Sequence, residues 1–254
     1  MRVKEKLRYE LKYVLTAEQA AAVRADLASY VEPDEHGDAQ GAYRIASLYY
    51  DTPDYRAYWD KLEGHKVRRK VRVRTYGDTV ADGDTMCYLE IKHRVNQRMG
   101  KRRARLPYVL ATDFDAFAER APAVDEADWA VMQEVGFLYA TLRLQPACIV
   151  RYDRLALNGD ASHPDLRITF DTNLRGRARV LNLLAAEQPV GAEDPYFLPP
   201  DRSIMEIKVN QTAPFWLTQI LSRHRCILRR VSKYCGALEQ SAVIQNRQRI
   251  MVRQ

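Results

Sequence analysis

The sequence predicts an α+β fold in which an antiparallel β-barrel forms a tunnel with a basic interior, and helices pack outside it. Three observations lead to this prediction. In several strand-like segments the charged residues fall two apart, so that in an extended strand they all point to one side. The other side of each segment is apolar, as in a strand with one buried face. Amphipathic helical segments between the strands need such an apolar surface to pack on.

The segment 66–74 shows this alternation most clearly, with Arg and Lys on one face and valines on the other. The segments 9–13, 88–92 and 205–209 repeat it, each with a single glutamate on its basic face. An ordinary wet sheet face would mix Thr, Ser, Gln and charges, whereas Arg and Lys dominate these faces. Such a composition indicates a ligand rather than bulk water.

Capping and turn signals divide the chain into strands. Thr16 begins a Thr-Ala-Glu-Gln capping box, which ends the first strand and starts a helix. Asp51-Thr52-Pro53 ends the second strand, and a Gly- and Asp-rich turn over 77–84 joins two long strands. The expected strands are the segment that ends at Thr16 and residues 43–50, 67–76, 86–95, 101–106, 147–157, 166–171 and 204–209.

Helices are expected where alanines accumulate or where apolar residues follow a helical period. Residues 112–142 carry two such patterns and predict a helical insertion packed on the sheet of a single domain that covers residues 1–254. A polar loop is expected over 33–41, an irregular stretch over 175–200 and a short segment over 229–233. The expected helices cover residues 17–30, 55–62, 112–120, 125–142, 214–224 and 234–249.

The charged strand faces are expected to line the interior, because the helices need the apolar faces to pack on. Isolated buried charges are costly, so an interior crowded with Arg and Lys must hold anions, water or both. The glutamates on the same faces suit magnesium or manganese, which prefer oxygen ligands and can bridge phosphate oxygens. Arg69 and Arg102 alternate with the inward-facing positions and are expected on the outer surface.

Composition limits the partner and the compartment. A net charge of +7 and an isoelectric point near 9.2 indicate a polyanionic partner, which could be nucleic acid, anionic lipid or a phosphorylated small molecule. The four cysteines lack the spacing of a metal site and predict a reducing compartment. No segment has the pattern of a signal peptide or a membrane span. A cytoplasmic location is expected, with a peripheral position at the inner membrane face left open.

On these residues the chain resembles the VTC-type polyphosphate polymerase domain, a branch of the CYTH or triphosphate tunnel metalloenzyme superfamily. The resemblance covers nearly the whole chain and rests on the order and spacing of several segments rather than on any one of them. These segments are Arg8-Tyr9-Glu10-Leu11-Lys12-Tyr13, Ser47-Leu48-Tyr49-Tyr50-Asp51-Thr52, Lys70-Val71-Arg72-Val73-Arg74, Leu89-Glu90-Ile91-Lys92, Arg103-Ala104-Arg105-Leu106, Tyr152-Asp153-Arg154, Leu166-Arg167-Ile168-Thr169-Phe170-Asp171-Thr172, Met205-Glu206-Ile207-Lys208 and Ser232-Lys233-Tyr234.

The resemblance implies a phosphotransferase that moves the γ-phosphoryl of ATP onto a polyphosphate chain with the help of Mn²⁺ or Mg²⁺. It implies Glu206 as the metal ligand, with Glu10 and Glu90 as further candidates. It also implies ATP or another triphosphate and inorganic polyphosphate as partners, no nucleic acid, and a separate membrane-protein partner for any transport. The implied catalytic residues are Lys12, Arg72, Arg74, Lys92, Arg154 and Lys233, and the implied substrate-binding residues are Arg103, Arg167, Lys208 and Ser232.

Several alternatives stay open. Glu10-Leu11-Lys12 carries only part of the ExExK signature of the hydrolase relatives, because Arg8 stands two residues before Glu10. This departure weakens a simple triphosphatase assignment, but a metal-dependent triphosphate or polyphosphate hydrolase is retained as an alternative. A non-catalytic polyanion-binding module is another alternative, and Glu10 and Glu90 could serve only as structural ion-pair partners.

Overall fold

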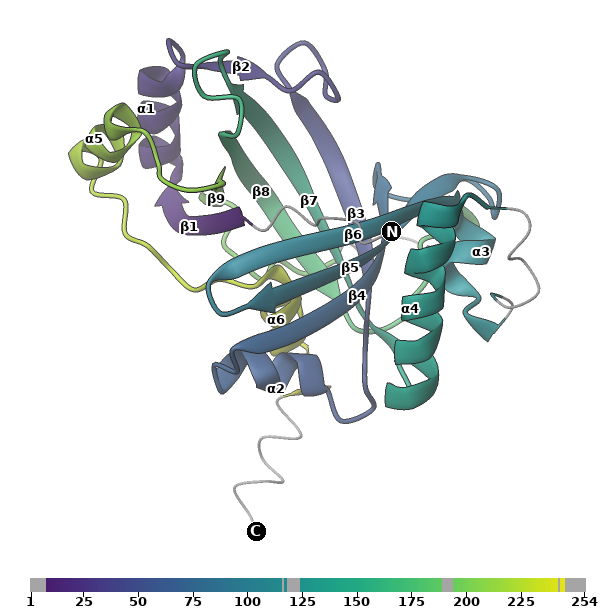
Figure 1. The fold of residues 1–254 in the computed structure, drawn as a ribbon. Coiled ribbons are helices and arrows are strands. Elements are labelled where there is room, and N and C mark those ends of the chain that lie inside the picture. The colour runs from purple at the N-terminus through teal and green to yellow at the C-terminus, as the bar shows by residue number, and fades with distance from the viewer. Residues whose placement is uncertain (1–7, 116, 118–123, 189–193, 242, 245–254) are drawn as a thin grey trace, which may run out of the picture.

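The computed structural model of the protein describes residues 8–115, 117, 124–188, 194–241 and 243–244. Within these residues, nine antiparallel strands form one sheet in the order β2-β7-β3-β4-β5-β6-β1-β9-β8, and β7 also pairs with β8. This additional pairing closes eight strands into a ring, to which β2 is attached through β7 (Figure 1). The predicted α+β fold, with antiparallel strands closed into a tunnel, is confirmed.

The elements follow the expected order along the chain. The strands are β1 (Arg8–Thr16), β2 (Val31–Pro33), β3 (Ala42–Asp51), β4 (Val67–Tyr76), β5 (Met86–Val95), β6 (Arg98–Pro107), β7 (Gln145–Gly159), β8 (Arg167–Arg177) and β9 (Arg202–Val209). The helices are α1 (Ala17–Leu27), α2 (Arg56–Leu62), α3 (Tyr108–Thr112), α4 (Glu126–Leu142), α5 (Phe215–Arg223) and α6 (Lys233–Glu239), with a 3₁₀ turn η2 (Ala185–Glu187).

Several strands, such as β6 and β7, extend one to three residues beyond their predicted bounds, and two differences are more notable. β2 lies partly in the expected loop and pairs with the end of β7; three residues are too short for an alternating pattern to reveal them. β8 continues six residues beyond the predicted end, into the stretch that was expected to be irregular. It can continue because Asn173 adopts a left-handed backbone conformation and the β7–β8 register shifts between Arg151 and Asp153.

The helices agree with the prediction except at their ends and at α3, which occupies residues 108–112, where no helix was predicted before residue 112. The capping box predicted at Thr16 is present, but α1 ends at Leu27, because the chain must turn before β2 begins. The helix expected over 112–120 is wrong at its start, since Thr112 ends α3 and Asp113 leaves the helical conformation; residues 116 and 118–120 lie outside the described residues. α6 begins one residue earlier than expected and ends at Glu239, and residues 242 and 245–249 also lie outside the described residues. A single domain with a helical insertion stays a prediction.

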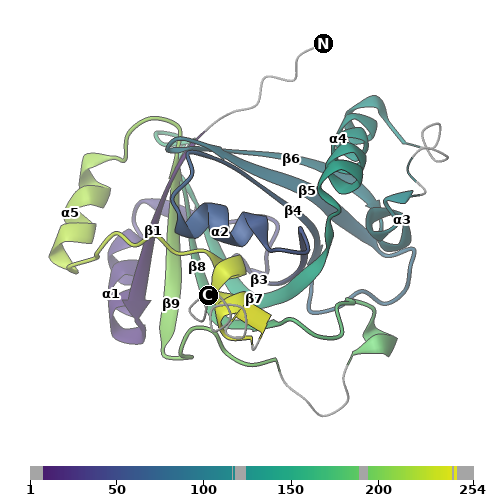
Figure 2. The same ribbon diagram turned by 90° about the horizontal axis from the view of Figure 1, so that it is seen from below.

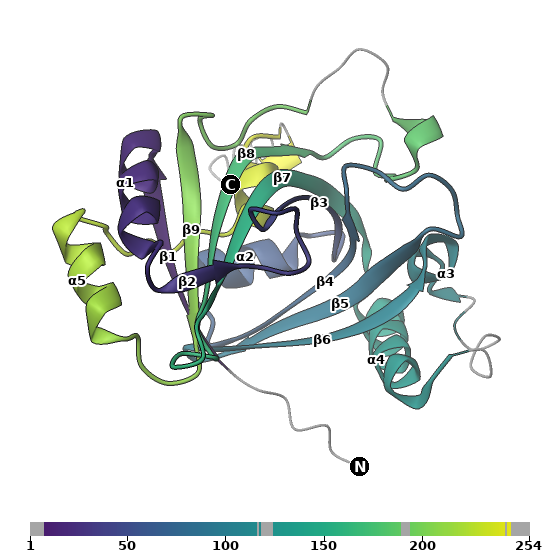
Figure 3. The same cartoon turned by 90° about the horizontal axis from the view of Figure 1, so that it is seen from above.

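The apolar strand faces lie on the outside of the ring, where α1, α3, α4 and α5 cover them. Val71, Ile91 and Met132 belong to a buried cluster beneath α3 and α4, while a second cluster packs α1 and α5 against β1 and β9. On this outer side Arg102 pairs with Glu134 of α4, as expected for an outward-facing residue. α2 and α6 lie instead across one end of the ring (Figure 2). β2 lies at the other end, seen in Figure 3.

No helix in the described part of the chain is long and apolar enough to span a membrane.

Candidate active site

A cavity of about 730 Å³ occupies the ring at the end where α2 and α6 lie. Its wall comes from the inner faces of β1, β3, β4, β5, β7 and β9, together with the end of α2 and the start of α6. Among the described residues, seven lysines and seven arginines line it, against two glutamates. The cationic residues are Lys12, Lys61, Lys66, Lys70, Lys92, Lys208, Lys233, Arg68, Arg72, Arg74, Arg94, Arg154, Arg229 and Arg230.

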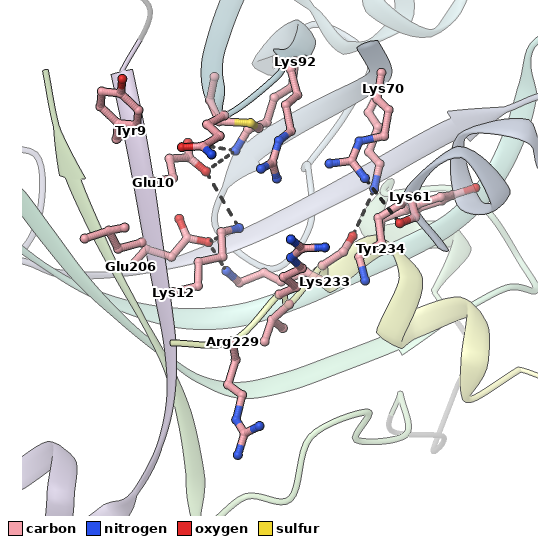
Figure 4. A pocket seen from close by; sticks show the side chains of 18 of the residues that line it. Tyr9, Glu10, Lys12, Lys61, Lys70, Lys92, Glu206, Arg229, Lys233 and Tyr234 are labelled. Carbon is pink, nitrogen blue, oxygen red and sulfur yellow. Dashed lines mark hydrogen bonds and ion pairs between the residues drawn. The ribbon is translucent and has the colours of Figure 1, made fainter. Parts of the chain in front are cut away.

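Glu10 and Glu206 lie side by side on neighbouring strands of the cavity wall. The antiparallel register of β1 and β9 pairs Glu10 with Lys208 and Lys12 with Glu206. The Nζ of Lys12 lies 3.0 Å from a carboxylate oxygen of Glu206 and 3.8 Å from one of Glu10. Lys92 on β5 donates to both oxygens of Glu10 at 3.0 Å (Figure 4). The two carboxylates therefore share one lysine and point into the same space.

Lys233 reaches this group from outside the sheet. It is the first residue of α6, and its Nζ lies 2.9 Å from Glu206 and 2.5 Å from Asp171 on β8. Arg154 on β7 also holds Asp171, with hydrogen bonds of 2.7 and 2.8 Å to its two oxygens. The fully buried Asp171 is therefore the counter-ion of two cavity cations. The sequence interpretation gave Asp171 no role, although the alternation of β8 places it on the same face as Arg167.

Neutral hydroxyl groups help to hold two arginines of β4, one of which, Arg72, is also paired with Glu90. Arg72 donates to the hydroxyl of Tyr49 at 2.8 Å. Arg74 donates to the hydroxyls of Ser47 at 3.1 Å and Tyr152 at 3.0 Å. Because these bonds fix the planes of the guanidinium groups, their remaining donors are directed before any ligand arrives.

Glu90 does not line the cavity. Its side chain is buried behind Arg72, which approaches one carboxylate oxygen to 2.6 Å, while Lys101 lies 3.2 Å from the other. This arrangement fits the ion-pair alternative for Glu90, and its role as a metal ligand stays a prediction.

The structure divides the remaining predicted residues. Lys208 lines the cavity, and so does Ser232, which caps α6 and accepts a hydrogen bond of 3.0 Å from Lys70. Arg103 and Arg167 do not line it. Arg103 is exposed and stacks 4.7 Å above the ring of Tyr88.

Arg167 is bound by residues at the far end of the ring. It pairs with the buried carboxylate of Asp34 and donates to Asn158 at 3.0 Å and to the hydroxyl of Tyr43 at 3.1 Å. Both Arg103 and Arg167 lie on the predicted strand faces but at the wrong end of their strands for the cavity. Lys70 was left out of the predicted set although it lies on the same face as Arg72.

The VTC domain family model matches residues 7–242 of the chain. The chain belongs to the VTC domain family. The resemblance found on the sequence segments is thereby confirmed, and family membership supports a function related to triphosphate or polyphosphate. No curated protein sequence matches the chain.

Solved structures with similar folds share little sequence with this VTC domain. The PH1819 protein from Pyrococcus horikoshii OT3 is 13% identical with a TM-score of 0.45, over 92% of this chain and 99% of its own. A proposed adenylyl cyclase from Hippeastrum, HpAC1, described as having a dominant triphosphatase activity, is 11% identical with a TM-score of 0.47, over 94% and 97%. A proposed adenylate cyclase from Bacillus halodurans is 12% identical with a TM-score of 0.47, over 90% and 95%.

Both glutamates of the VTC domain cavity are anionic at neutral pH. Burial alone would raise the pKa of Glu10, but Lys92 and Lys12 outweigh it and lower that pKa to about 2. Burial likewise opposes the ionisation of Glu206, yet Lys12 and Lys233 hold its pKa well below the ordinary value. Lys208 differs, because burial lowers its pKa to about 7 and Glu206 offsets only part of that effect. One cavity lysine therefore titrates near neutral pH.

The carboxylates fit a metal ion that arrives together with phosphate. In the described part of the chain, no group of three or more His, Cys, Asp or Glu side chains could hold a metal ion. Glu10 and Glu206 offer two carboxylates surrounded by lysines, so water or phosphate oxygens would supply the remaining ligands. Mg²⁺ is commonly bound in this way, by one or two carboxylates plus phosphate oxygens.

Proposed function

We propose that this VTC domain is a polyphosphate polymerase-like phosphotransferase that moves the γ-phosphoryl of ATP onto a polyphosphate chain. The observation that carries the proposal is the charge of the cavity: fourteen lysines and arginines against two glutamates within the described residues, enclosed by a ring of strands. The nearby carboxylates of Glu10, Glu206, Asp171 and Glu90 pair with only some of these fourteen cations. The remaining positive charge favours a bound anion, and a chain of phosphates carries a negative charge on every phosphate unit. A separate membrane-protein partner stays a prediction.

The fixed arginines suit the chemistry of phosphoryl transfer. A terminal oxygen of the polyphosphate attacks the γ-phosphorus of ATP, the bond from that phosphorus to the β–γ bridging oxygen breaks, and ADP leaves. Because a terminal phosphate oxygen is already ionised, no protein base has to remove a proton. What remains for the protein is positioning and neutralisation of the charge on the transferred group. Arg72 and Arg74 supply directed donors, while Lys12 and Lys233 supply positive charge beside Glu206.

A divalent metal ion, when bound, would neutralise charge on the phosphate oxygens. Glu206 would hold it, with Glu10 beside it on β1. The donor set consists of carboxylate oxygens, which suits Mg²⁺ or Mn²⁺ rather than a metal that prefers sulfur or imidazole ligands.

Incubation with ATP and Mn²⁺, with and without a short polyphosphate primer, tests the proposal. The products are resolved by phosphorus NMR, alongside an assay for free phosphate. A growing signal of internal phosphates, with ADP and little free phosphate, is the expected result. Free phosphate alone would establish a hydrolase instead, and tight polyphosphate binding without turnover would establish a binding module.

The titration of Lys208 predicts that polyphosphate binding takes up a proton near pH 8. With a pKa of about 7, Lys208 is mostly neutral at that pH, and a bound anion favours its charged form. Affinity should therefore fall as the pH rises above 7, by up to about tenfold per pH unit. Calorimetry with long-chain polyphosphate in two buffers of different ionisation enthalpy measures the uptake.

Lys208→Arg is the matched variant for this measurement, because arginine stays charged throughout this pH range. The variant should bind polyphosphate without proton uptake and with a flatter pH profile. Equal uptake in the variant and the wild type would show that another group titrates.

A further inference from the structure

Three tyrosines lie on the inner strand faces at the end of the ring opposite α2 and α6. Tyr43 is near the start of β3, Tyr76 ends β4 and Tyr88 is near the start of β5. The rings of Tyr43 and Tyr76 are 5.5 Å apart, and those of Tyr76 and Tyr88 are 5.6 Å apart, both edge to face. The guanidinium of Arg103 on β6 covers the ring of Tyr88 at 4.7 Å. Four adjacent strands thus each contribute one planar group to a row, the tyrosine row.

The tyrosine row adjoins the cavity. Tyr76 follows Arg74 by two residues on the same strand face, about 7 Å further along at ~3.4 Å of rise per residue. Tyr43 is paired with Arg154 across β3 and β7. Arg74 and Arg154 both line the cavity, whereas none of the three tyrosines does. The tyrosine row therefore lies just beyond Arg74 and Arg154, on the side away from α2 and α6.

The ring of Tyr76, in the middle of the row, contacts both of its neighbours and is also exposed to solvent. Tyr76 is 46% exposed, although the rings of Tyr43 and Tyr88 contact it on two sides. Tyr43 is itself fixed, because its hydroxyl accepts a hydrogen bond from Arg167. A large exposed aromatic ring on an inner strand face has no packing role that requires its exposure. Nucleobases stack on such rings, and a guanidinium plane beside them adds a further flat surface.

We propose that the tyrosine row, with Tyr76 at its centre, is the seat for the base of the donor nucleotide. This inference rests on the proposed function, because it places the triphosphate of the same nucleotide at Arg74 and Arg154. The base then lies at the end of the ring opposite the part of the cavity that Lys61 of α2 and Arg229 line. Since stacking does not depend on base identity, we expect ATP and GTP to use the seat alike.

Tyr76→Ala tests the seat through a comparison of two ligands. Dissociation constants are measured by calorimetry, without divalent metal and at fixed salt, for a non-hydrolysable ATP analogue and for inorganic tripolyphosphate. The variant should bind the ATP analogue about tenfold more weakly, as expected for the loss of one stacked base, and tripolyphosphate within twofold of the wild type. Tyr76→Phe keeps the ring and should bind both ligands as the wild type does.

Tyr30→Ala is the matched control, because Tyr30 stacks on Trp216 of α5 at a centroid distance of 4.2 Å. The helix α5 lies outside the ring (Figure 1). Tyr30→Ala should change neither dissociation constant. A parallel loss of both ligands in Tyr76→Ala would show that Tyr76 only supports the fold, and unchanged binding of both would also overturn the seat. Failure of the wild type to bind tripolyphosphate would instead refute the proposed function, so the two failures are distinguishable.

Discussion

Replacing Glu206 with glutamine is expected to lower ATP-dependent polyphosphate synthesis by at least about 100-fold, while polyphosphate binding stays equal or becomes tighter. The side chain keeps its size, but the cavity loses the carboxylate proposed to hold the metal ion. Loss of one preorganised electrostatic partner at a reacting centre typically costs about 100- to 1,000-fold in rate. The affinity for polyphosphate should not fall, because Lys12 and Lys233 lose an anionic partner and become available to phosphate. Initial rates of ADP release and calorimetric binding of polyphosphate measure the two effects separately.

Glu35→Gln is the control for this prediction, since the Glu35 side chain is 87% exposed and pairs only with His36 among the ion pairs of the described residues. It should leave both synthesis and binding unchanged. If Glu206→Gln keeps more than a third of the wild-type rate, Glu206 does not hold a metal ion in the reaction. Tighter binding with an unchanged rate would identify Glu206 as a counter-ion only.

The alternation along the strands was sufficient to predict which side chains point into the ring. Lys12, Arg72 and Lys92 lie where a period of two residues places them, and the valines between the β4 cations lie under the helices. A period of two decides between the faces of a strand because adjacent side chains point in opposite directions. The face on which a residue lies depends only on its position within its own strand, so one sequence is enough to predict it.

The same alternation could not show how far along the tunnel a residue lies. Arg167 shares the inner face of β8 with Asp171, yet it pairs with Asp34, which is 133 positions away in the sequence. That contact depends on how the loop before β3 folds over the end of the ring. The alternation also could not predict that Lys233 lines the cavity, for a different reason. This residue lies on a helix rather than a strand, and only the family resemblance pointed to it.

Replacing Asp171 with asparagine is expected to lower the free energy of unfolding by about 3–5 kcal/mol near neutral pH. Asp171 is fully buried and accepts hydrogen bonds from Arg154 while pairing with Lys233. Removing one partner of a buried ion pair leaves uncompensated charge, which accounts for a loss of this size. Chemical denaturation measures it. Asp153→Asn, on the same sheet but with a side chain that is 40% exposed, should cost less than about 1 kcal/mol.

The difference in the free energy of unfolding between wild type and Asp171→Asn should depend on pH with a definite sign. Burial opposes the ionisation of Asp171, but Arg154 and Lys233 outweigh it and lower its pKa below 3.8. A carboxyl group with a lowered pKa stabilises the fold above its unfolded-state pKa, and that stability is lost as the pH falls through the folded-state value. The stabilities of wild type and Asp171→Asn should therefore differ fully at pH 7. The difference should begin to shrink as the pH falls past the unfolded-state pKa of about 4, and vanish only below the folded-state pKa.

Polyphosphate should restore part of the stability that Asp171→Asn loses. In the wild type, Asp171 already neutralises Arg154 and Lys233, so a bound anion adds less there than in the variant. Saturation at 100 times the dissociation constant stabilises any folded protein by about 2.7 kcal/mol, and tighter binding to the variant would add to this shift at equal ligand concentration. The effect of polyphosphate on the two proteins is compared through the increase it causes in the free energy of unfolding. A larger increase in the variant would show that Asp171, in the free protein, neutralises the cations that phosphate neutralises in the complex. An equal ligand-induced increase in stability in both proteins would mean that Arg154 and Lys233 do not contact the phosphate chain. The residues that bind it would then be among the other cavity cations, such as Lys61 and Arg229.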